Sequence, residues 1–316
     1  MRSNALNLRG MDGHLDPDTA LVRPVDIVAS TEQRLPIVLS SPHSGSIYPR
    51  DLLAASRLDA HALRRSEDSF VDEIFAGGPE IGAPLLRARF ARAYIDLNRE
   101  PFELDPAMFE DPLPSFVNTR SPRVQVGLGT IARIVASGED IYARKLRFSE
   151  ALWRVQRLYQ PYHRSLRQLL DGTRRRFGCY LLIDCHSMPS SGGVQDRGGR
   201  GRVDFVLGDC HGTACHPAII DTAQRIIAGK GYSVARNTPY AGGFTTCHYG
   251  RPRDHGHGLQ IEINRALYMD ERTIRRKPFL KQIAADMQEL VAALGAIGLE
   301  TLTPSAPSRR AAMGGG

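Results

Sequence analysis

Two histidines and one glutamate lie at or within strongly hydrophobic segments of the sequence. His43 lies near the end of Leu35–Gly45, His186 lies in Leu181–Pro189, and Glu262 has an isoleucine on each side. Short apolar runs bounded by turn-forming residues indicate strands that are buried on both faces. In open α/β sheets, ligands bind at the carboxyl ends of such strands. The three side chains therefore predict one shared site, and their types favour metal-dependent hydrolysis of an amide.

Zinc is the metal that the two histidines favour. Imidazole and carboxylate groups are its usual ligands, and a catalytic zinc ion keeps one coordination position open for water. His43 and His186 are our candidate ligands because each lies where a predicted strand ends.

A carboxylate is expected as the third ligand. The segment Arg65–Glu73 offers four acids, and the pattern leaves the choice between Glu67 and Asp68 open. Asp184 lies two residues before His186 and therefore on the same side of an extended strand. From there it could hold the histidine by a hydrogen bond instead of binding the metal.

Glu262 is our candidate for proton transfer. A carboxylate inside an apolar run needs a partner or a raised pKa, because an unpaired buried charge is costly. A raised pKa makes a carboxylate useful as a general base or acid near neutral pH. A salt bridge to Arg265 is the alternative interpretation.

Two further segments are candidates for substrate binding. Arg99 carries a planar guanidinium that matches a carboxylate, and with the adjacent Asn98 it is a plausible clamp for an acidic substrate. The loop Gly242–Pro252 supplies hydroxyl and amide groups, so we expect Thr245 and Tyr249 to line the pocket.

Strand-like and helix-like segments alternate along the chain, which is typical of an α/β fold. No internal repeat or linker divides the chain, so one domain is expected. The predicted strands are Asp26–Ser30, Pro36–Ser40, Ala83–Phe90, Ala93–Leu97, Cys179–Asp184, Val203–Gly208, Tyr232–Arg236 and Gly258–Asn264. The predicted helices are Asp59–Ala76, a long stretch over Glu139–Arg176 that Pro161 kinks or divides, Ala214–Ala228 and Glu271–Leu294.

The loops and termini complete the expected organisation. Residues 1–20 predict a flexible arm, 21–302 the catalytic domain and 303–316 a disordered tail. The loops Pro101–Gly129 and Ser187–Gly201 are rich in proline and glycine respectively. Long loops of this kind within a compact domain are usually lids or binding loops.

Composition limits the class of protein. Of the 316 residues, 42% are hydrophobic and 24% charged, and the net charge is +7. This charge fits a nucleic-acid-binding protein as well as an enzyme for small acidic substrates. The basic cluster Arg174–Arg176 is typical of a helix end and has no interleaved aromatic residues. With no secretory signal or membrane-length apolar run, we expect a soluble cytoplasmic protein.

The cysteines predict no disulfide. Their number is odd and they form no CxxC pair, so they resemble small core residues of a reduced protein. A Cys185–His186 hydrolase pair is disfavoured because neighbouring strand residues point to opposite faces. The segment Asp209–His216 could form a second metal cluster, although a strand end that leads into a helix is the favoured interpretation. The five cysteines are Cys179, Cys185, Cys210, Cys215 and Cys247.

Taken together, the motifs resemble the N-formylglutamate amidohydrolase family. The resemblance implies a fold like that of the zinc carboxypeptidase and aspartoacylase group, in which a mixed sheet carries helices on both faces. The matching motifs, in chain order, are Ser41–Gly45, Glu67–Asp72, Ala93–Arg99, Leu128–Arg133, Ile183–Met188 and Gly242–Glu262.

The resemblance also implies roles for individual residues. The zinc ligands would be His43, Asp68 and His186, with Asp68 preferred because related sequences keep an aspartate there. Glu262 would be the proton shuttle. Asn98 and Arg99 would bind a substrate carboxylate.

Two further points follow from the same resemblance. Zinc or an arginine such as Arg133 would stabilise the oxyanion. Carboxypeptidases place their acidic ligand three residues after the first histidine, where this chain has Ser46. The second ligand must therefore come from elsewhere.

The implied reaction is hydrolysis of N-formyl-L-glutamate to formate and L-glutamate, the last step of one route of histidine degradation. A deacylase for another N-acyl amino acid is the alternative within the same chemistry. A basic nucleic-acid-binding protein is the alternative from another class, although we expect no nucleic-acid or membrane partner.

Overall fold

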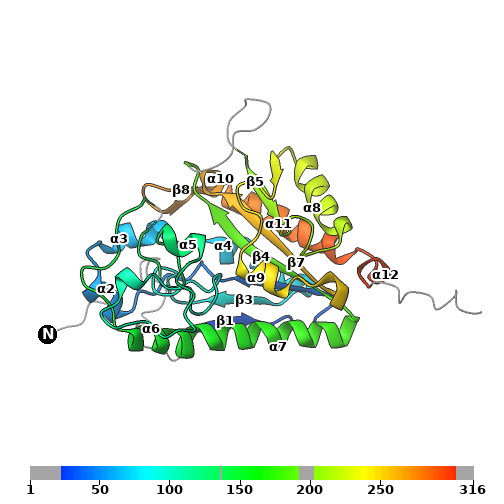
Figure 1. Cartoon of the computed structure of the whole chain (residues 1–316). Helices are drawn as coiled ribbons and strands as arrows, with labels where there is room; N and C mark the ends of the chain where they lie inside the picture. The colour runs from blue at the N-terminus through cyan, green and yellow to red at the C-terminus, as the bar shows by residue number, and fades with distance from the viewer. Residues whose placement is uncertain (1–22, 136, 192–202, 304–316) are drawn as a thin grey trace, which may run out of the picture.

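The computed structural model describes residues 23–135, 137–191 and 203–303. Within these ranges seven strands form one mixed sheet, in the order β1-β3-β2-β4-β7-β5-β6 (Figure 1). Most of both terminal segments and much of Ser187–Gly201 lie outside the described residues. None of the described helices has the length and hydropathy that crossing a bilayer requires. The strands are β1 Val25–Val28, β2 Ile37–Ser41, β3 Leu85–Ala88, β4 Tyr180–Met188, β5 Phe205–Gly208, β6 Val234–Arg236 and β7 Gly256–Asn264.

The central strands set the position of the candidate site. Strands β3, β2, β4 and β7 run parallel to one another, whereas β1 pairs antiparallel with β3, and β5 antiparallel with β7. The carboxyl ends of the four parallel strands therefore meet at one edge of the sheet. His43 follows β2, His186 lies near the end of β4, and Glu262 lies near the end of β7.

Both faces of the sheet are covered, which confirms the predicted three-layer arrangement. Alternate residues of a strand point to opposite faces. Val38 and Leu182 belong to one hydrophobic cluster, and Leu39 and Ile183 belong to the other. Helices α6 and α7 cover the first face, and α4, α8 and α11 the second (Figure 1). The helices of these two layers are α4 Val71–Ile74, α6 Phe148–Arg154, α7 Gln160–Phe177, α8 Pro217–Gly229 and α11 Leu280–Gly295.

The remaining elements are short and lie mainly near the ends of the sheet. A small antiparallel pair, β8 with β9, follows β7. The remaining helices and strands are α2 Arg50–Ala55, α3 Ala60–Leu63, α5 Pro122–Gln125, α9 Phe244–Tyr249, α10 Arg265–Tyr268, α12 Leu299–Leu302, β8 Met269–Asp270 and β9 Arg275–Arg276.

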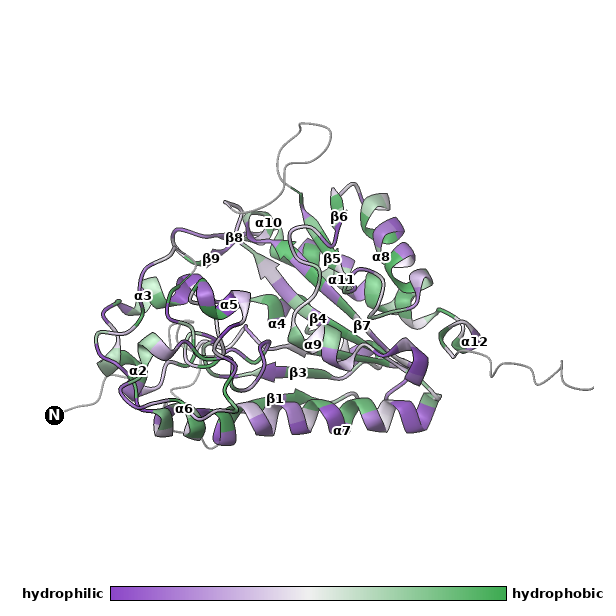
Figure 2. Cartoon of the chain, in the orientation of Figure 1, coloured by the Kyte–Doolittle hydropathy of each residue, from purple (hydrophilic) through white to green (hydrophobic). Residues whose placement is uncertain are grey.

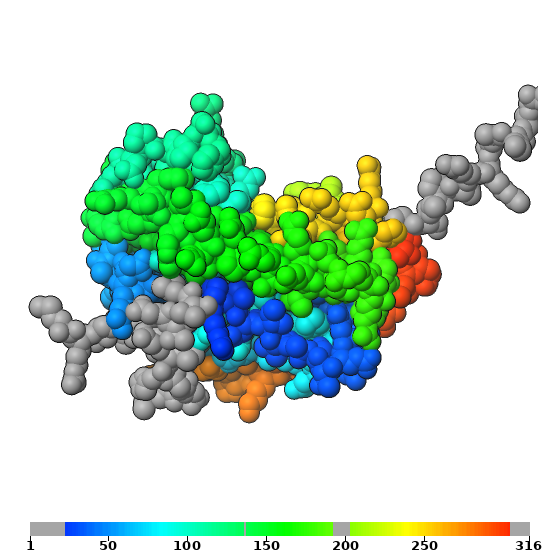
Figure 3. All heavy atoms as spheres, turned by 90° about the horizontal axis from the view of Figure 1, so that it is seen from below, coloured from blue at the N-terminus to red at the C-terminus, as the bar shows by residue number. Residues whose placement is uncertain are grey.

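The long helical stretch differs in detail from the prediction. Helix begins only at Phe148, and a π-helical turn over Val155–Tyr159 joins α6 to α7 directly before Pro161. Because the helix continues through that turn, the proline does not divide it. Hydrophobic and hydrophilic residues alternate along α7 in Figure 2. In the view from below in Figure 3, the green atoms of α6 and α7 lie across the face of the molecule that is shown.

Three predicted elements differ from the structure, and two of the differences fall at the site. Asp59–Ala76 is not one helix, because extended backbone at Glu67 and a left-handed Phe70 (φ 69°) separate α3 from α4. Ala93–Leu97 forms turns instead of a strand. The helix predicted from Glu271 begins only at α11, since β9 occupies part of that segment.

The turn after β2 depends on a glycine. Gly45 lies two residues after His43, and a Cβ atom at Gly45 would collide with the carbonyl group of Phe90. Overpacking of this kind costs about 1–3 kcal/mol. We expect Gly45→Ala to lower the free energy of unfolding by about this amount in urea titrations.

Gly229→Ala is the matched control for this substitution. Apart from its chain neighbours and the adjacent backbone of its own helix, no described atom lies within 4 Å of the Cβ position of Gly229, which ends α8. Its free energy of unfolding should stay constant or rise by up to about 1 kcal/mol. Equal stability of the Gly45→Ala variant and the parent would contradict the packing described for this turn.

Candidate active site

His43 lies on the turn that leaves β2, and its side chain is 2% exposed. The hydroxyl groups of Ser41 and Ser44 are hydrogen-bonded across this turn. The carbonyl of His43 accepts a hydrogen bond from the backbone N–H of Asp68 over 3.0 Å. The histidine turn and the acidic segment are therefore held side by side by their main chains.

Asp68, and not Glu67, faces the histidines. The carboxylate of Glu67 accepts hydrogen bonds from Tyr48 and Ser69 and pairs with Arg64, which turns it away from the cluster. The break in the predicted helix presents Asp68 instead, because the left-handed residue Phe70 lies only two positions after it. The structure thus favours the aspartate that the resemblance implied.

The side chains of His43, Asp68 and His186 converge. One potential ligand atom of each lies within 4.8 Å of the other two, and all three residues are buried. The Nδ1 atoms face Asp68 Oδ2, at 3.4 Å from His43 and 3.0 Å from His186. The cluster is the product of two strand ends and one loop that are far apart in the sequence.

Each imidazole is oriented by a second carboxylate on its other nitrogen. His43 Nε2 lies 2.7 Å from Asp96 Oδ1, and His186 Nε2 lies 3.0 Å from Asp184 Oδ1. His43 Nδ1 is buried and has no hydrogen-bond partner within the described residues. A carboxylate behind each histidine, with the other ring nitrogen directed at a shared point, is typical of metal ligands. The donor set therefore fits a divalent metal ion.

Charge balance in the cluster keeps Asp68 ionised. Burial alone would raise the pKa of this carboxyl, but the hydrogen bond from His186 and the charges of His43 and Arg265 hold the pKa well below its ordinary value. Arg265 Nη2 lies 2.9 Å from Asp68 Oδ1. Burial lowers the pKa of His186, yet Asp184 and Asp68 together raise it well above its ordinary value.

Glu262 faces the same cavity from the neighbouring strand. It pairs in register with His186 across β4 and β7, so the two side chains lie on the same face of the sheet. Burial raises the pKa of Glu262 to about 7. Gln260 donates a hydrogen bond to Glu262 Oε1 over 2.9 Å. The alternative salt bridge is not formed, since Arg265 binds Asp68 instead.

The cluster opens into a cavity of about 810 Å³, which Asn98 and Arg99 also line. Asn98 is occupied by the protein itself. Its amide nitrogen lies 3.0 Å from His186 Nε2, and its oxygen accepts a hydrogen bond from the backbone of Thr245. Arg99 donates to two backbone carbonyls, and its Nη2 lies 3.7 Å from Asp96. Arg99 is therefore better placed than Asn98 to meet a substrate carboxylate.

Three of the predicted substrate-binding residues do not line this cavity. Arg133 lies on the half-exposed outer side of its loop, where it pairs with Asp140. Thr245 is fully buried. The hydroxyl of Tyr249 is directed away from the cavity, to the ring of His163 at 3.0 Å. We therefore leave these three residues out of the proposed substrate contacts.

The sequence analysis missed Asp96, which lies in the segment wrongly predicted as a strand. This buried carboxylate contacts His43, pairs with Arg92 at 2.6 Å and accepts a hydrogen bond from the backbone of Asn98. The signal was available, because Asp96 lies between Ile95 and Leu97 just as Glu262 lies between isoleucines. Burial of an acid in such a run requires partners.

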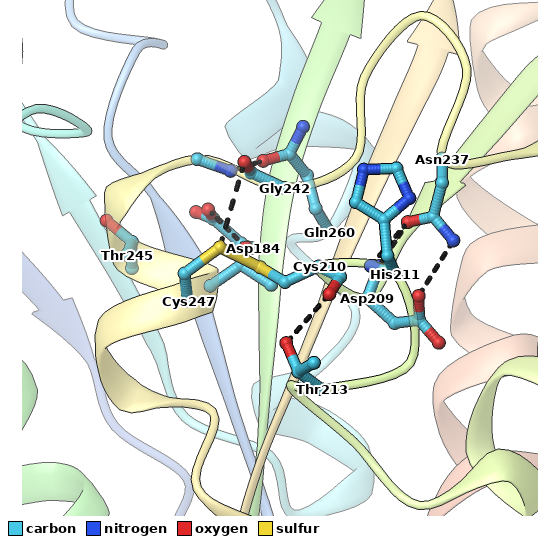
Figure 4. Close-up of a disulfide and its surroundings, with 12 residues drawn as sticks. Asp184, Asp209, Cys210, His211, Thr213, Asn237, Gly242, Thr245, Cys247 and Gln260 are labelled. Atoms are coloured by element: carbon cyan, nitrogen blue, oxygen red, sulfur yellow. Dashed lines mark hydrogen bonds between the residues drawn. A yellow bond between two sulfur atoms is a disulfide. The ribbon is translucent and has the colours of Figure 1, made fainter. Parts of the chain in front are cut away.

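A disulfide between Cys210 and Cys247 braces one wall of the cavity, which contradicts the prediction that the cysteines are all reduced. Figure 4 shows the bond joining the loop after β5 to α9, beside Gly242. The carbonyl of Ala241 accepts a hydrogen bond from the backbone N–H of Cys210. Neighbouring Gly243 donates to the side chain of Gln260 over 2.7 Å. Spacing could not reveal this pair, because the two cysteines meet only through the fold.

The other cysteine predictions are confirmed. Cys179, Cys185 and Cys215 are free and buried. The segment Asp209–His216 connects the end of β5 to α8, as expected. Within the described residues, His43, Asp68 and His186 form the one cluster whose atoms could hold a metal ion.

Fold and site together define a class of protein: a single-domain mixed α/β fold with a buried histidine–carboxylate–histidine cluster at the carboxyl ends of parallel strands. A model of the N-formylglutamate amidohydrolase family matches residues 35–269. The chain belongs to this family.

Individual relatives agree with this assignment. The chain is 30% identical over 282 residues to an N-formylglutamate deformylase of Pseudomonas putida, covering 87% of this chain and 98% of the relative. A deformylase of the same name from Pseudomonas aeruginosa is 29% identical over 280 residues, with coverage of 87% and 98%.

Solved structures give the same result. The crystal structure of N-formylglutamate amidohydrolase from Ralstonia eutropha JMP134 is 37% identical, with a TM-score of 0.80 over 86% of this chain and 97% of that chain. The structure of a gene product from Agrobacterium tumefaciens is 21% identical and has a TM-score of 0.64, with coverage of 89% and 97%. This second match shows a shared fold.

The orienting role of Asp96 can be tested by metal affinity. Loss of a carboxylate behind a ligand histidine typically weakens metal binding about 10- to 100-fold. We expect this reduction for Asp96→Asn, measured with Zn²⁺ in competition with a chelator. Asp140→Asn, which removes an exposed acid paired with Arg133, is the control and should bind as the parent does. Parental affinity in the Asp96→Asn protein would contradict the assignment.

Proposed function

We propose that the chain hydrolyses N-formyl-L-glutamate to formate and L-glutamate, with a zinc ion held by His43, Asp68 and His186. The observation that carries the proposal is the buried Nδ1 of His43, which makes no hydrogen bond to any described residue and lies close to the potential ligand atoms of Asp68 and His186. The names of the relatives support the choice of substrate, since two are N-formylglutamate deformylases. Zinc supplies a Lewis acid that polarises a carbonyl and lowers the pKa of water.

Glu262 moves the proton in this mechanism. As an oxygen of water bonds to the formyl carbon, the carboxylate of Glu262 accepts the water proton. The bond between the formyl carbon and the amide nitrogen then breaks, and Glu262 delivers the proton to the leaving nitrogen. Burial of Glu262 suits both steps, because it brings the pKa of this carboxyl to about 7. Gln260 fixes one carboxylate oxygen and leaves the other for water.

The remaining residues position substrate and cluster. Arg99 binds the α-carboxylate of the substrate from the cavity wall. Asn98 holds the ring of His186 and the backbone of Thr245, so its role is to position protein groups instead of substrate. Arg265 stabilises the charge of Asp68.

We propose that the reaction serves histidine degradation, as the family resemblance implies. A cytoplasmic location and the absence of nucleic-acid partners stay predictions. The cavity of about 810 Å³ also has room for larger acyl groups. Comparing the N-formyl and N-acetyl derivatives of L-glutamate would separate the proposed substrate from this alternative, and we expect the formyl compound to be preferred.

Removal of the proton shuttle gives the sharpest test of this function. General acid–base groups contribute about 10²- to 10⁴-fold to rate. We expect Glu262→Gln to lower kcat on N-formyl-L-glutamate by at least about 100-fold while bound zinc is retained. Glu271→Gln, which alters another acid of the same cavity, should stay within about threefold of the parent. A fully active Glu262→Gln enzyme with its metal bound would rule out the shuttle role.

The pH dependence follows from the same carboxylate. Glu262 must be deprotonated to accept a proton, and burial raises its pKa to about 7. Falling pH therefore removes the active form. The bound zinc ion, as a nearby cation, would lower the pKa of Glu262. We therefore expect kcat/KM to fall on the acid side, beginning at or below about pH 7. Below that point it should fall about tenfold for each pH unit. An identical limb in the Glu262→Gln protein would show that another group titrates.

A further inference from the structure

Arginines are unusually common in the wall of the cavity, and most of them are neutralised by acids of the protein. These pairs are Arg64 with Glu67, Arg65 with Glu139, Arg92 with Asp96 and Arg265 with Asp68. Of the other arginines in the wall, Arg99 lies 3.7 Å from Asp96, and Arg272 is exposed to solvent.

Arg123 differs from these arginines. It lies in α5, is half-buried, and lines the cavity. Its guanidinium makes no hydrogen bond or ion pair with the rest of the described chain. A half-buried guanidinium keeps its full charge at any physiological pH. The cavity wall therefore carries a positive charge without a protein partner at this point.

Arg123 and Arg99 are connected through one residue. The carbonyl of Arg123 accepts a hydrogen bond from the backbone N–H of Leu128 over 2.8 Å. The carbonyl of Leu128 in turn accepts one from Arg99 Nε over 3.0 Å. This chain of bonds fixes the loop carrying Arg123 against the segment carrying Arg99, and both residues line the cavity.

The two cations repel each other in the free protein. Burial lowers the pKa of Arg99 to about 10, and the positive charge of nearby Arg123 contributes in the same direction. A ligand with two negative groups would relieve this repulsion, since charge-assisted hydrogen bonds to guanidinium are among the strong ones. A ligand with one carboxylate at Arg99, which already lies 3.7 Å from Asp96, would leave Arg123 without an acidic partner.

We propose that Arg123 binds the side-chain carboxylate of the substrate while Arg99 binds its α-carboxylate, which makes the enzyme selective for N-formyl derivatives of dicarboxylic amino acids. The inference rests on the proposed function, and it names the residue that selects an acidic side chain. Arg123 takes no part in proton transfer. Its loss therefore acts on binding and raises KM while kcat changes little.

The test compares two substrates that differ in charge but hardly in shape, N-formyl-L-glutamate and N-formyl-L-glutamine. For Arg123→Met we expect kcat/KM on the glutamate compound to fall about 10- to 100-fold, mainly through KM. On the glutamine compound the change should stay below about threefold. Arg123→Lys, which keeps the charge, should recover part of the lost preference.

Arg120→Met is the matched control. Arg120 is exposed on the same loop and does not line the cavity, so its substitution should leave both substrates unaffected. Equal losses on both substrates in the Arg123→Met protein would indicate a structural role and overturn the inference. Unchanged selectivity would overturn it as well.

A binding measurement separates this inference from the proposed function. If the parent protein hydrolyses neither compound, the proposed function fails. Calorimetric binding of L-glutamate and L-glutamine, which needs no turnover, then decides the role of Arg123. The parent should prefer L-glutamate, and Arg123→Met should lose that preference. A variant that keeps the parental preference, or a parent that has none, would overturn the inference.

Discussion

The ionised carboxylate of Asp68 lies in the interior of the protein, and the rest of the site depends on how its charge is balanced. Two imidazoles and Arg265 surround it. Breaking a buried ion pair by removing one partner typically costs about 3–5 kcal/mol, because the other charge is left uncompensated. The cluster is therefore stable only when its charged groups, which come from β2, β4 and the loop before α4, are all in place.

Further polar and charged groups lie behind the cluster and hold its members in place. Asp96 and Asp184 orient the histidines, and Arg92 and Asn98 in turn hold these two acids. Because each group is fixed by the next, the nitrogens that face Asp68 are directed before any metal binds. Preorganisation of this kind reduces what binding must cost in ordering side chains.

The sequence predicted much of the sheet and of the site. The apolar runs that contain His186 and Glu262 are typical of buried strands, and they form β4 and β7. It failed where tertiary contacts override local preference. The segment around Phe70 has a helical pattern, yet its backbone is forced open so that Asp68 can reach the histidines. Asp96 was missed because its segment reads as a strand. The disulfide was out of reach, since Cys210 and Cys247 are far apart until the chain has folded.

We propose that one metal ion binds to His43 Nδ1, His186 Nδ1 and a carboxylate oxygen of Asp68. Anomalous diffraction from crystals of the zinc-loaded protein would locate that ion. We predict one strong peak at about 2.0–2.2 Å from His43 Nδ1, His186 Nδ1 and a carboxylate oxygen of Asp68. A peak bound through the Nε2 atoms, or zinc located away from these three residues, would contradict the account.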